Sequence, residues 1–130
     1  RQKDMIRRSS ENIAAREVEA VLNSIPAVLE SAAVPVPDDV RGEEVKAYIV
    51  LREGGGRGDN ALHEIINGCQ AQLAKFKVPR YFSFRTELPK TASLKVAKQG
   101  LLASAREGTE RTYDRIAGCW IGTAGMETIP

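Results

Sequence analysis

The sequence is poor in the residue types on which several classes of site depend. Its 130 residues include two cysteines and one histidine. Cys69 and Cys119 are far apart and form no C-x-x-C pair, so neither a disulfide framework nor a zinc ligand set is expected. Cys69 stands among apolar residues, and a buried thiol is the simpler interpretation of it. His63 has no cysteine or carboxylate set around it, which argues against a metal site, and no Ser/His/Asp or Cys/His set can be assembled.

Long apolar segments and a strong charge of one sign are also missing. No hydrophobic run approaches the roughly 20 residues that a membrane span needs. The N-terminus is charged and polar, so a signal peptide is not expected. The formal net charge of +2 at pH 7 is too small a surplus to suggest a nucleic-acid partner. With its reduced cysteines, the sequence favours a cytoplasmic protein that has no membrane span and binds no nucleic acid.

The length is that of one domain with a single core. We expect this domain to cover residues 1–106, and we expect residues 107–130 to form an irregular tail, because the apolar pattern fades after Glu107. Arg1 falls inside a charged motif rather than ahead of it, which predicts a fragment cut near a domain boundary.

Hydrophobic periodicity predicts a hairpin followed by helices that alternate with strands. The expected strands are Met5–Arg8, Asn12–Ile13, Ser31–Val36, Val45–Leu51 and Tyr81–Phe84, and the expected helices are Ala15–Asn23, Ala61–Leu73 and Val96–Arg106. Pro35 has no N–H for a ladder, which places its strand near an edge. The strands at 31–36 and 45–51 are adjacent in sequence and should pair as a hairpin. We therefore expect an α+β fold, with a small mixed sheet plus an N-terminal two-stranded hairpin, covered by about three helices.

The stretch LPKTASLKVAK, residues 88–98, is the most informative part of the chain. A proline that restricts the backbone precedes a threonine and a serine whose hydroxyls can bond to main-chain groups. This pattern predicts a stiff loop that holds up Lys95, whose ammonium could stabilise developing negative charge. A solvated surface lysine is the alternative, and spacing by itself does not choose among Lys90, Lys95 and Lys98.

Two other stretches could carry chemistry. The opening segment RQKDMIRRSSENI places Arg7 and Arg8 at the tip of the predicted hairpin, where they would suit a phosphate or carboxylate partner. A solvated charged hairpin is the alternative. The stretch FKVP, residues 76–79, offers a basic residue, but it can equally be a helix-to-strand linker with Phe76 in the core.

These stretches resemble the C-terminal domain of the acyl-adenylate-forming enzymes, the acyl-CoA synthetase family. The family carries P-x-T-x-S-G-K, which Pro89, Thr91, Ser93 and Lys95 match in register. Its G-R-x-K/D-D-x-I-x-x-x-G-x-N-I-x-x-x-E-V-E motif is matched from Arg1 to Glu19. In each motif a glycine is replaced, by Leu94 and by Ser10. The SLKVAK ending is similar to crotonobetaine/carnitine-CoA ligases.

The resemblance implies a role for each site residue. Lys95 would be the catalytic residue, placed between the substrate carboxylate and the α-phosphate of ATP. Lys3 would be the hinge about which the domain rotates, and Arg1 would contact the nucleotide. The residues implied in coenzyme A binding are Arg7, Arg8, Ser9, Ser10, Phe76 and Lys77.

The implied reaction is that of an acid–thiol ligase, in which a carboxylate, ATP and coenzyme A give an acyl-CoA, AMP and pyrophosphate. ATP with magnesium would be bound mainly by an N-terminal domain of the same enzyme, which is the expected partner besides a carboxylic acid substrate. The isolated fragment is expected to be inactive. The alternative is a non-catalytic binding or interaction domain that retains the fold but not the chemistry, an interpretation that Leu94 and Ser10 would favour.

Overall fold

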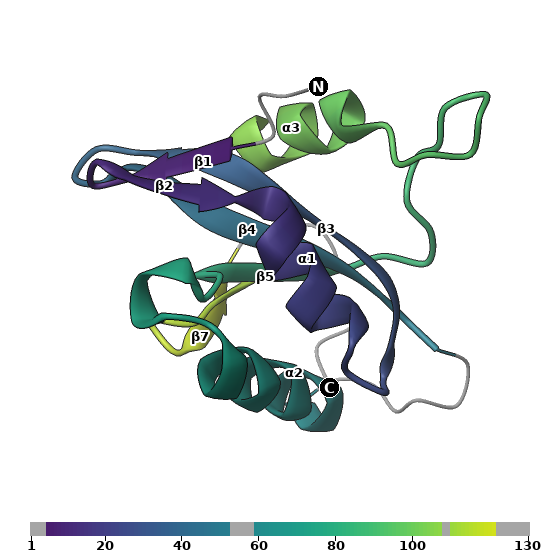
Figure 1. The fold of residues 1–130 in the computed structure, drawn as a ribbon, viewed down its shortest axis with the longest axis horizontal. Helices are drawn as coiled ribbons and strands as arrows, with labels where there is room; N and C mark the ends of the chain where they lie inside the picture. The colour runs from purple at the N-terminus through teal and green to yellow at the C-terminus, as the bar shows by residue number, and fades with distance from the viewer. Residues whose placement is uncertain (1–4, 53–58, 108–109, 122–130) are drawn as a thin grey trace.

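The computed structural model describes residues 5–52, 59–107 and 110–121. It is an α+β fold in which helices cover both faces of a mixed sheet, as the sequence predicts (Figure 1). Among the described residues, no helix has both the length and the apolar character to cross a membrane.

The elements follow the predicted order, with two strands added at the end. They are β1 (Met5–Arg8), β2 (Glu11–Ala14), α1 (Ala15–Asn23), β3 (Val28–Asp38), β4 (Gly42–Leu51), α2 (Asp59–Gln72), the 3-10 turn η1 (Lys75–Lys77), β5 (Tyr81–Phe84), α3 (Lys98–Glu107), β6 (Thr112–Asp114) and β7 (Cys119–Ile121). Strands β3 and β4 both extend beyond the predicted bounds toward the turn at 39–41, where the backbone N–H groups of Val40 and Arg41 donate to the Asp38 carboxylate. Strand β3 also begins earlier than predicted, at Val28, which pairs with Leu51.

Strand β4 lies at the centre of the sheet. Along one edge it pairs antiparallel with β3 over nearly its whole length, which confirms the predicted hairpin. On its other side it pairs with β1 at Gly42 and, further along, with β5 in parallel. The parallel pair is joined by α2, as a crossover requires. Strand β3 pairs only with β4 among the described strands, so Pro35 lies on an edge strand as predicted.

Alternation along β4 divides the core in two. Val45, Ala47 and Ile49 face α1 and α2, while Tyr48 and Val50 face α3. Each of these five side chains is buried because helices cover both faces of the strand. The helices α1 and α2 pack the apolar stripes that periodicity predicted against the larger core cluster. Cys69 of α2, which we expected to be buried, is one of its members.

The expectation of an irregular C-terminal tail is wrong for residues 112–121. Strand β6 pairs antiparallel with β5, and β7 pairs with β6, so this segment extends the sheet. Three-residue strands give too little alternation to be found by periodicity, and they form here because β5 offers a free edge. Residues 122–130 lie outside the described part of the chain, and the domain boundary at residue 106 stays a prediction.

A buried polar cluster fastens the C-terminal segment to the centre of the sheet. The Lys46 ammonium donates to Glu110 Oε1 at 2.9 Å and to Thr112 Oγ1 at 3.0 Å. The Tyr48 hydroxyl also donates to Glu110, and Arg85 lies 3.4 Å from the other carboxylate oxygen. Burial opposes ionisation of Glu110, but the hydrogen bonds from Tyr48 and Lys46 outweigh it and lower the pKa of that carboxyl.

The two cysteines differ in exposure, which predicts different reactivity. Cys69 is fully buried and burial raises the pKa of its thiol to about 12, whereas Cys119 is exposed on β7. Because the thiolate is the reactive form, iodoacetamide should modify Cys119 and spare Cys69 in the folded chain. Intact mass should show one adduct before unfolding and two after it. Two adducts on the folded chain would contradict the burial of Cys69.

Candidate functional site

The loop that carries Lys95 is closed by its own backbone. Lys90 and Val96 form an isolated antiparallel bridge. Above that bridge, the N–H of Thr91 donates to the Lys95 carbonyl at 2.7 Å, and the Lys95 N–H donates to Thr91 Oγ1 at 3.3 Å. Below it, the Ala97 N–H donates to the Pro89 carbonyl at 2.8 Å. The predicted stiff, hydroxyl-tied loop is therefore present, and Figure 1 shows it projecting between β5 and α3.

Ion pairing separates Lys95 from its two neighbours. Lys90 Nζ lies 3.2 Å from Glu30 Oε1, and Lys98 Nζ lies 2.6 Å from Glu19 Oε2. Lys95 is exposed and has no carboxylate partner within the described part of the chain. Sequence spacing left the three lysines equivalent, and the structure shows that Lys95 alone of the three presents an unpaired ammonium within the described ranges.

Leu94 adopts the conformation that a glycine would provide. Its φ angle is 66°, in the left-handed region, and its side chain is 80% exposed. Ser10 in the N-terminal hairpin also adopts a left-handed backbone conformation, with a φ angle of 73°. A non-glycine residue in this region costs roughly 1–2 kcal/mol. Both replacements of a family glycine thus retain the backbone turn at the cost of local strain.

The β1–β2 hairpin carries four of the residues implied in coenzyme A binding, two at the end of β1 and two in the turn. The side chain of Arg7 is exposed, and its backbone N–H donates to Glu43 Oε1 at 2.8 Å. Ser9 and Ser10 form the tip, both exposed and both with positive φ. The N–H of Ser9 donates to the Arg41 carbonyl at 2.8 Å, which places the β3–β4 turn beside this tip.

Arg8 is held differently from Arg7. Its Nε donates to the buried Glu44 carboxylate at 2.7 Å. The other oxygen of Glu44 lies 3.5 Å from Arg80, which in turn makes two hydrogen bonds with Asp114. Burial opposes ionisation of Asp114, but these two bonds, together with those from the backbone N–H groups of Ala117 and Ile116, outweigh it and lower the pKa of that carboxyl. Arg8 therefore anchors the hairpin to the sheet through an internal ion pair, whereas Arg7 is exposed. The exposed guanidinium of Arg41 also lies at this tip, where it donates to Ser9 Oγ at 3.3 Å.

Phe76 and Lys77 lie in η1, between α2 and β5. Phe76 is half-buried against the larger core cluster. Lys77 Nζ lies 2.9 Å from Glu17 Oε1 and 5.6 Å from the centre of the Phe76 ring. The Phe76 ring therefore contributes to the packing of the core. The Lys77 ammonium forms an ion pair with Glu17.

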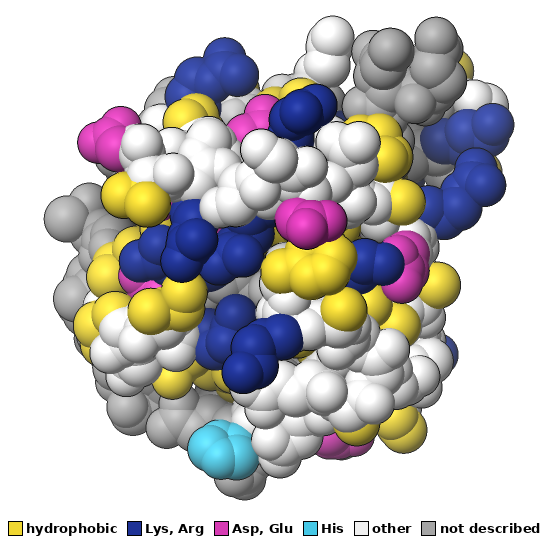
Figure 2. All heavy atoms as spheres, turned by 60° about the vertical axis from the view of Figure 1, so that its left-hand side comes forward, with side chains coloured by type: hydrophobic (Ala, Val, Ile, Leu, Met, Phe, Trp, Pro, Cys, Tyr) yellow, Lys and Arg dark blue, Asp and Glu magenta, His cyan; other side chains and the backbone are white. Residues whose placement is uncertain are grey.

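The predicted residues fall into two groups at opposite ends of the molecule. The β1–β2 turn and η1 lie at the left in Figure 1, whereas the Lys95 loop projects at the right. Figure 2 brings the left-hand end forward and shows Lys and Arg side chains gathered across it. Arg1 and Lys3 lie outside the described residues, so their predicted roles stay predictions.

Sequence reasoning missed the acidic partners of these cations. In the sequence, Glu19 stands out only as part of the N-terminal motif, and no pattern marks Glu30 or Glu44 as the partner of a cation. Their partners are between 36 and 79 residues away in sequence, as for Glu19 and Lys98. Periodicity in the sequence cannot predict these ion pairs, because the two residues of each pair meet only when the sheet and helices fold together.

Comparison with known proteins identifies the family. The profile of the AMP-binding enzyme C-terminal domain matches residues 17–95. The chain is 43% identical over 105 residues to a sulfoacetate–CoA ligase of Cupriavidus necator, and 38% identical over 98 residues to a crotonobetaine/carnitine–CoA ligase of Proteus mirabilis. These matches cover 81% and 75% of this chain but only 20% and 18% of the relatives.

A solved structure agrees with these matches. The acyl-CoA synthetase of Brucella canis superimposes with a TM-score of 0.76 at 36% identity, over 81% of this chain and 19% of that one. The chain belongs to the AMP-binding enzyme C-terminal domain family, and it spans about a fifth of the length of the relatives it matches.

The strain at Leu94 predicts a stabilising substitution. Leu94→Gly removes the left-handed penalty of about 1–2 kcal/mol and adds a smaller entropic cost in the unfolded chain. We expect the free energy of unfolding to rise by roughly 0.5–1 kcal/mol, measured by urea denaturation. The matched control is Ala92→Gly, two residues earlier in the same loop without positive φ, which should lower stability. A loss of stability in both variants would mean that Leu94 is unstrained.

Proposed function

We propose that this chain is the mobile C-terminal domain of an ATP-dependent acyl-CoA synthetase, and that Lys95 serves its adenylation step. The observation that carries the proposal is the exposed Lys95 ammonium, raised on a closed loop without a carboxylate partner among the described residues. The family membership of the chain supports it, as do relatives that are CoA ligases.

The proposed reaction has two steps. A carboxylate oxygen of the substrate attacks the α-phosphorus of ATP and displaces pyrophosphate, which gives an acyl-adenylate. The sulfur of coenzyme A then attacks the acyl carbon and displaces AMP, while the thiol loses its proton. In the first step two anionic groups must approach each other, and a fixed ammonium placed between them lowers that cost. Lys95 is the side chain of the described domain that suits this task.

The separation of the two groups of residues supports a domain that presents one end at a time. A single reaction site cannot meet the Lys95 loop and the β1–β2 turn together, because the two project from opposite ends (Figure 1). Rotation about Lys3 would withdraw Lys95 after adenylation and bring the β1–β2 turn to the site. Such conformational steps commonly separate consecutive reactions of one enzyme.

At the β1–β2 end, Arg7 is the side chain best placed to receive the phosphates of coenzyme A. It is exposed, whereas Arg8 is held by Glu44. Ser9 and Ser10 would line the path of the pantetheine arm, because their positive φ angles turn the backbone tightly at the tip. Lys77 would add a second cation from η1, because its partner Glu17 is exposed at the surface, unlike the buried Glu44 that holds Arg8. Phe76 would hold that turn against the core. Arg1 would contact the nucleotide.

The remaining components of the reaction would be supplied outside this domain. The described residues gather no group of three or more His, Cys, Asp or Glu side chains that could hold a metal ion, so magnesium would come with ATP on an N-terminal domain. That domain would also carry the acyl pocket, and relatives that act on unlike acids leave the carboxylic acid open. We propose a cytoplasmic enzyme, in keeping with two unpaired cysteines.

The alternative function is that of a binding domain that has lost the chemistry. The replacement of glycine by Leu94 and Ser10 would favour it, but both residues keep the left-handed backbone that glycine would adopt. The retained turn argues that the loop conformation is still needed.

Replacement of Lys95 tests the proposal in the full-length protein. Lys95→Ala should slow adenylation, measured by pyrophosphate exchange, by at least 100-fold, since each loss of about 1.4 kcal/mol in transition-state stabilisation is a tenfold rate loss. Thioester formation from preformed acyl-adenylate should be largely unchanged, because the lysine acts only in the first step. Arg16→Ala, which removes an exposed cation from α1, is the control and should alter neither step. Equal losses in both half-reactions would contradict the assigned role.

The isolated 130-residue chain should show pyrophosphate exchange at background level. It offers the cation but none of the proposed ATP and acyl pockets, so positioning of the reactants is missing. Clear ATP-dependent thioester formation by this chain alone would contradict the division of labour proposed here.

A further inference from the structure

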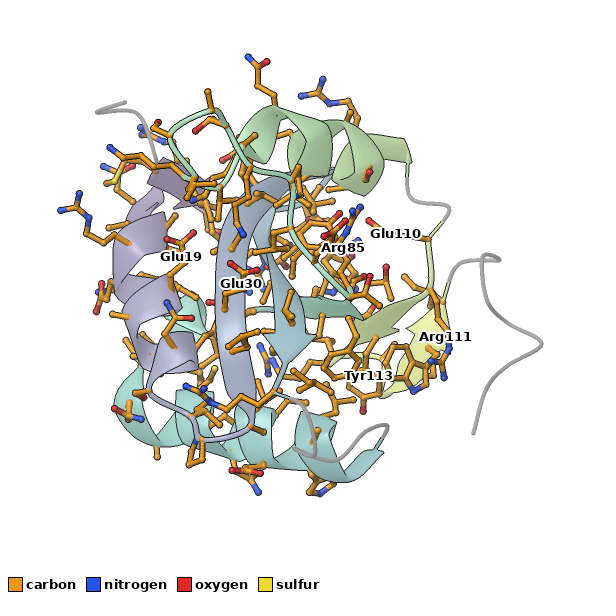
Figure 3. The ribbon with its side chains drawn as sticks, turned by 90° about the vertical axis from the view of Figure 1, so that its right-hand side faces the viewer. Glu19, Glu30, Arg85, Glu110, Arg111 and Tyr113 are labelled. Atoms are coloured by element: carbon orange, nitrogen blue, oxygen red, sulfur yellow. The ribbon has the colours of Figure 1, made fainter. Side chains whose placement is uncertain are left out.

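Two ion pairs join the Lys95 loop to the body of the domain, one at each end of the loop. Lys90 begins the loop and reaches Glu30 on β3, at 3.2 Å between Nζ and Oε1. Lys98 follows the loop at the start of α3 and reaches Glu19 on α1, at 2.6 Å between Nζ and Oε2. Figure 3 looks onto the end of the molecule that carries the loop and shows Glu19 and Glu30 on neighbouring elements.

The acidic partners are themselves fixed. Glu19 Oε2 also accepts a hydrogen bond from the backbone N–H of Ala33 at 2.9 Å, so it joins α1 to β3 as well as to the loop. Glu30 lies within the β3–β4 ladder, in register with Val50. The side chains of Lys98 and Glu19 are only 22% and 20% exposed, so solvent and salt screen this pair less than a fully exposed one.

The loop needs such external support. Its internal hydrogen bonds close it, but they act within residues 89–97 and do not set its direction relative to the sheet. Leu94, at the tip, is 80% exposed and adds no packing, while its left-handed backbone stores strain. A strained conformation persists only where its surroundings determine it. Contacts that orient the loop must therefore act at its ends. The two ion pairs lie there, beside the apolar contacts of Leu88 and Val96 with the smaller core cluster.

We propose that Glu30 and Glu19 are positioning residues for Lys95, holding the two ends of its loop so that the ammonium is presented at a fixed place. This inference rests on the proposed role of Lys95 in adenylation. Neither glutamate touches a reacting atom in this arrangement. Each acts through a lysine that it pairs with, and thereby keeps that lysine from competing with Lys95 for an anionic substrate.

The test uses Glu30→Gln, Glu19→Gln and the double variant in the full-length protein. Glutamine keeps the size of the side chain and one oxygen acceptor, so it removes the charge with little change in packing. We expect kcat for adenylation to fall about threefold to tenfold in each single variant, because a small displacement of a catalytic group is costly. KM for ATP and the rate of thioester formation from preformed acyl-adenylate should be unchanged.

A double-mutant cycle with Lys95→Ala separates positioning from general stability. If the glutamates act through Lys95, Glu30→Gln should cause no further loss of adenylation once Lys95 is replaced. The matched control is Glu87→Gln, the same change at an exposed position shortly before the loop, which should leave both half-reactions as they are. A double variant that exchanges the charges of this ion pair, Glu30→Lys with Lys90→Glu, should recover much of the adenylation rate that Glu30→Gln loses.

The outcomes are distinguishable. Unchanged adenylation in the glutamine variants, an equal loss in both half-reactions, or an undiminished loss in the Lys95→Ala background each overturns the positioning role while leaving the role of Lys95 intact. If Lys95→Ala itself leaves adenylation unchanged, the proposed function and this inference fall together.

Discussion

The arrangement of the rest of the domain depends on the burial of β4 on both of its faces. Its side chains enter two separate cores, and both of its edges are paired. The hairpin β1–β2 meets it at Gly42, where the strand begins, and β5 runs parallel to it and ends beside Ile49. The β1–β2 turn and the Lys95 loop therefore leave the sheet near opposite ends of one strand, at Gly42 and beyond Ile49, which are roughly 23 Å apart along its length. The separation of the two groups of candidate residues follows from this strand.

Charge pairing then determines which cations remain available. At one end, Glu44 binds Arg8 and leaves Arg7 exposed. At the other, Glu30 and Glu19 bind the two lysines that flank Lys95. In both places the acidic partner comes from a strand or helix of the body, so the ion pair also fixes the direction of a projecting turn. The same ion pairs therefore have two effects: they leave Arg7 exposed at one end and Lys95 at the other, and they fix the direction of the turn or loop that carries each cation.

Much of the fold could be predicted from the sequence because its elements have clear periodicity. The bounds of β1, α1 and β5 agree with those expected, and the edge position of β3 follows from Pro35. The strands β6 and β7 could not be predicted, since three residues make too short a pattern and their pairing depends on the edge of β5. For the site, motif resemblance marked Lys95, but no local signal marked Glu30, which is 60 residues from its partner.

The sequence by itself determined the family, the order of the elements and the loop chemistry, because these are encoded in residues close together along the chain: a proline, two hydroxyls and a lysine in 89–95, and apolar stripes in the helices. Only the tertiary structure decided which of the three lysines has no carboxylate partner among the residues described, which arginine is anchored, and that Leu94 and Ser10 adopt left-handed turns. Those outcomes depend on side chains that meet across the sheet from distant positions, and on the packing that holds a strained backbone in place.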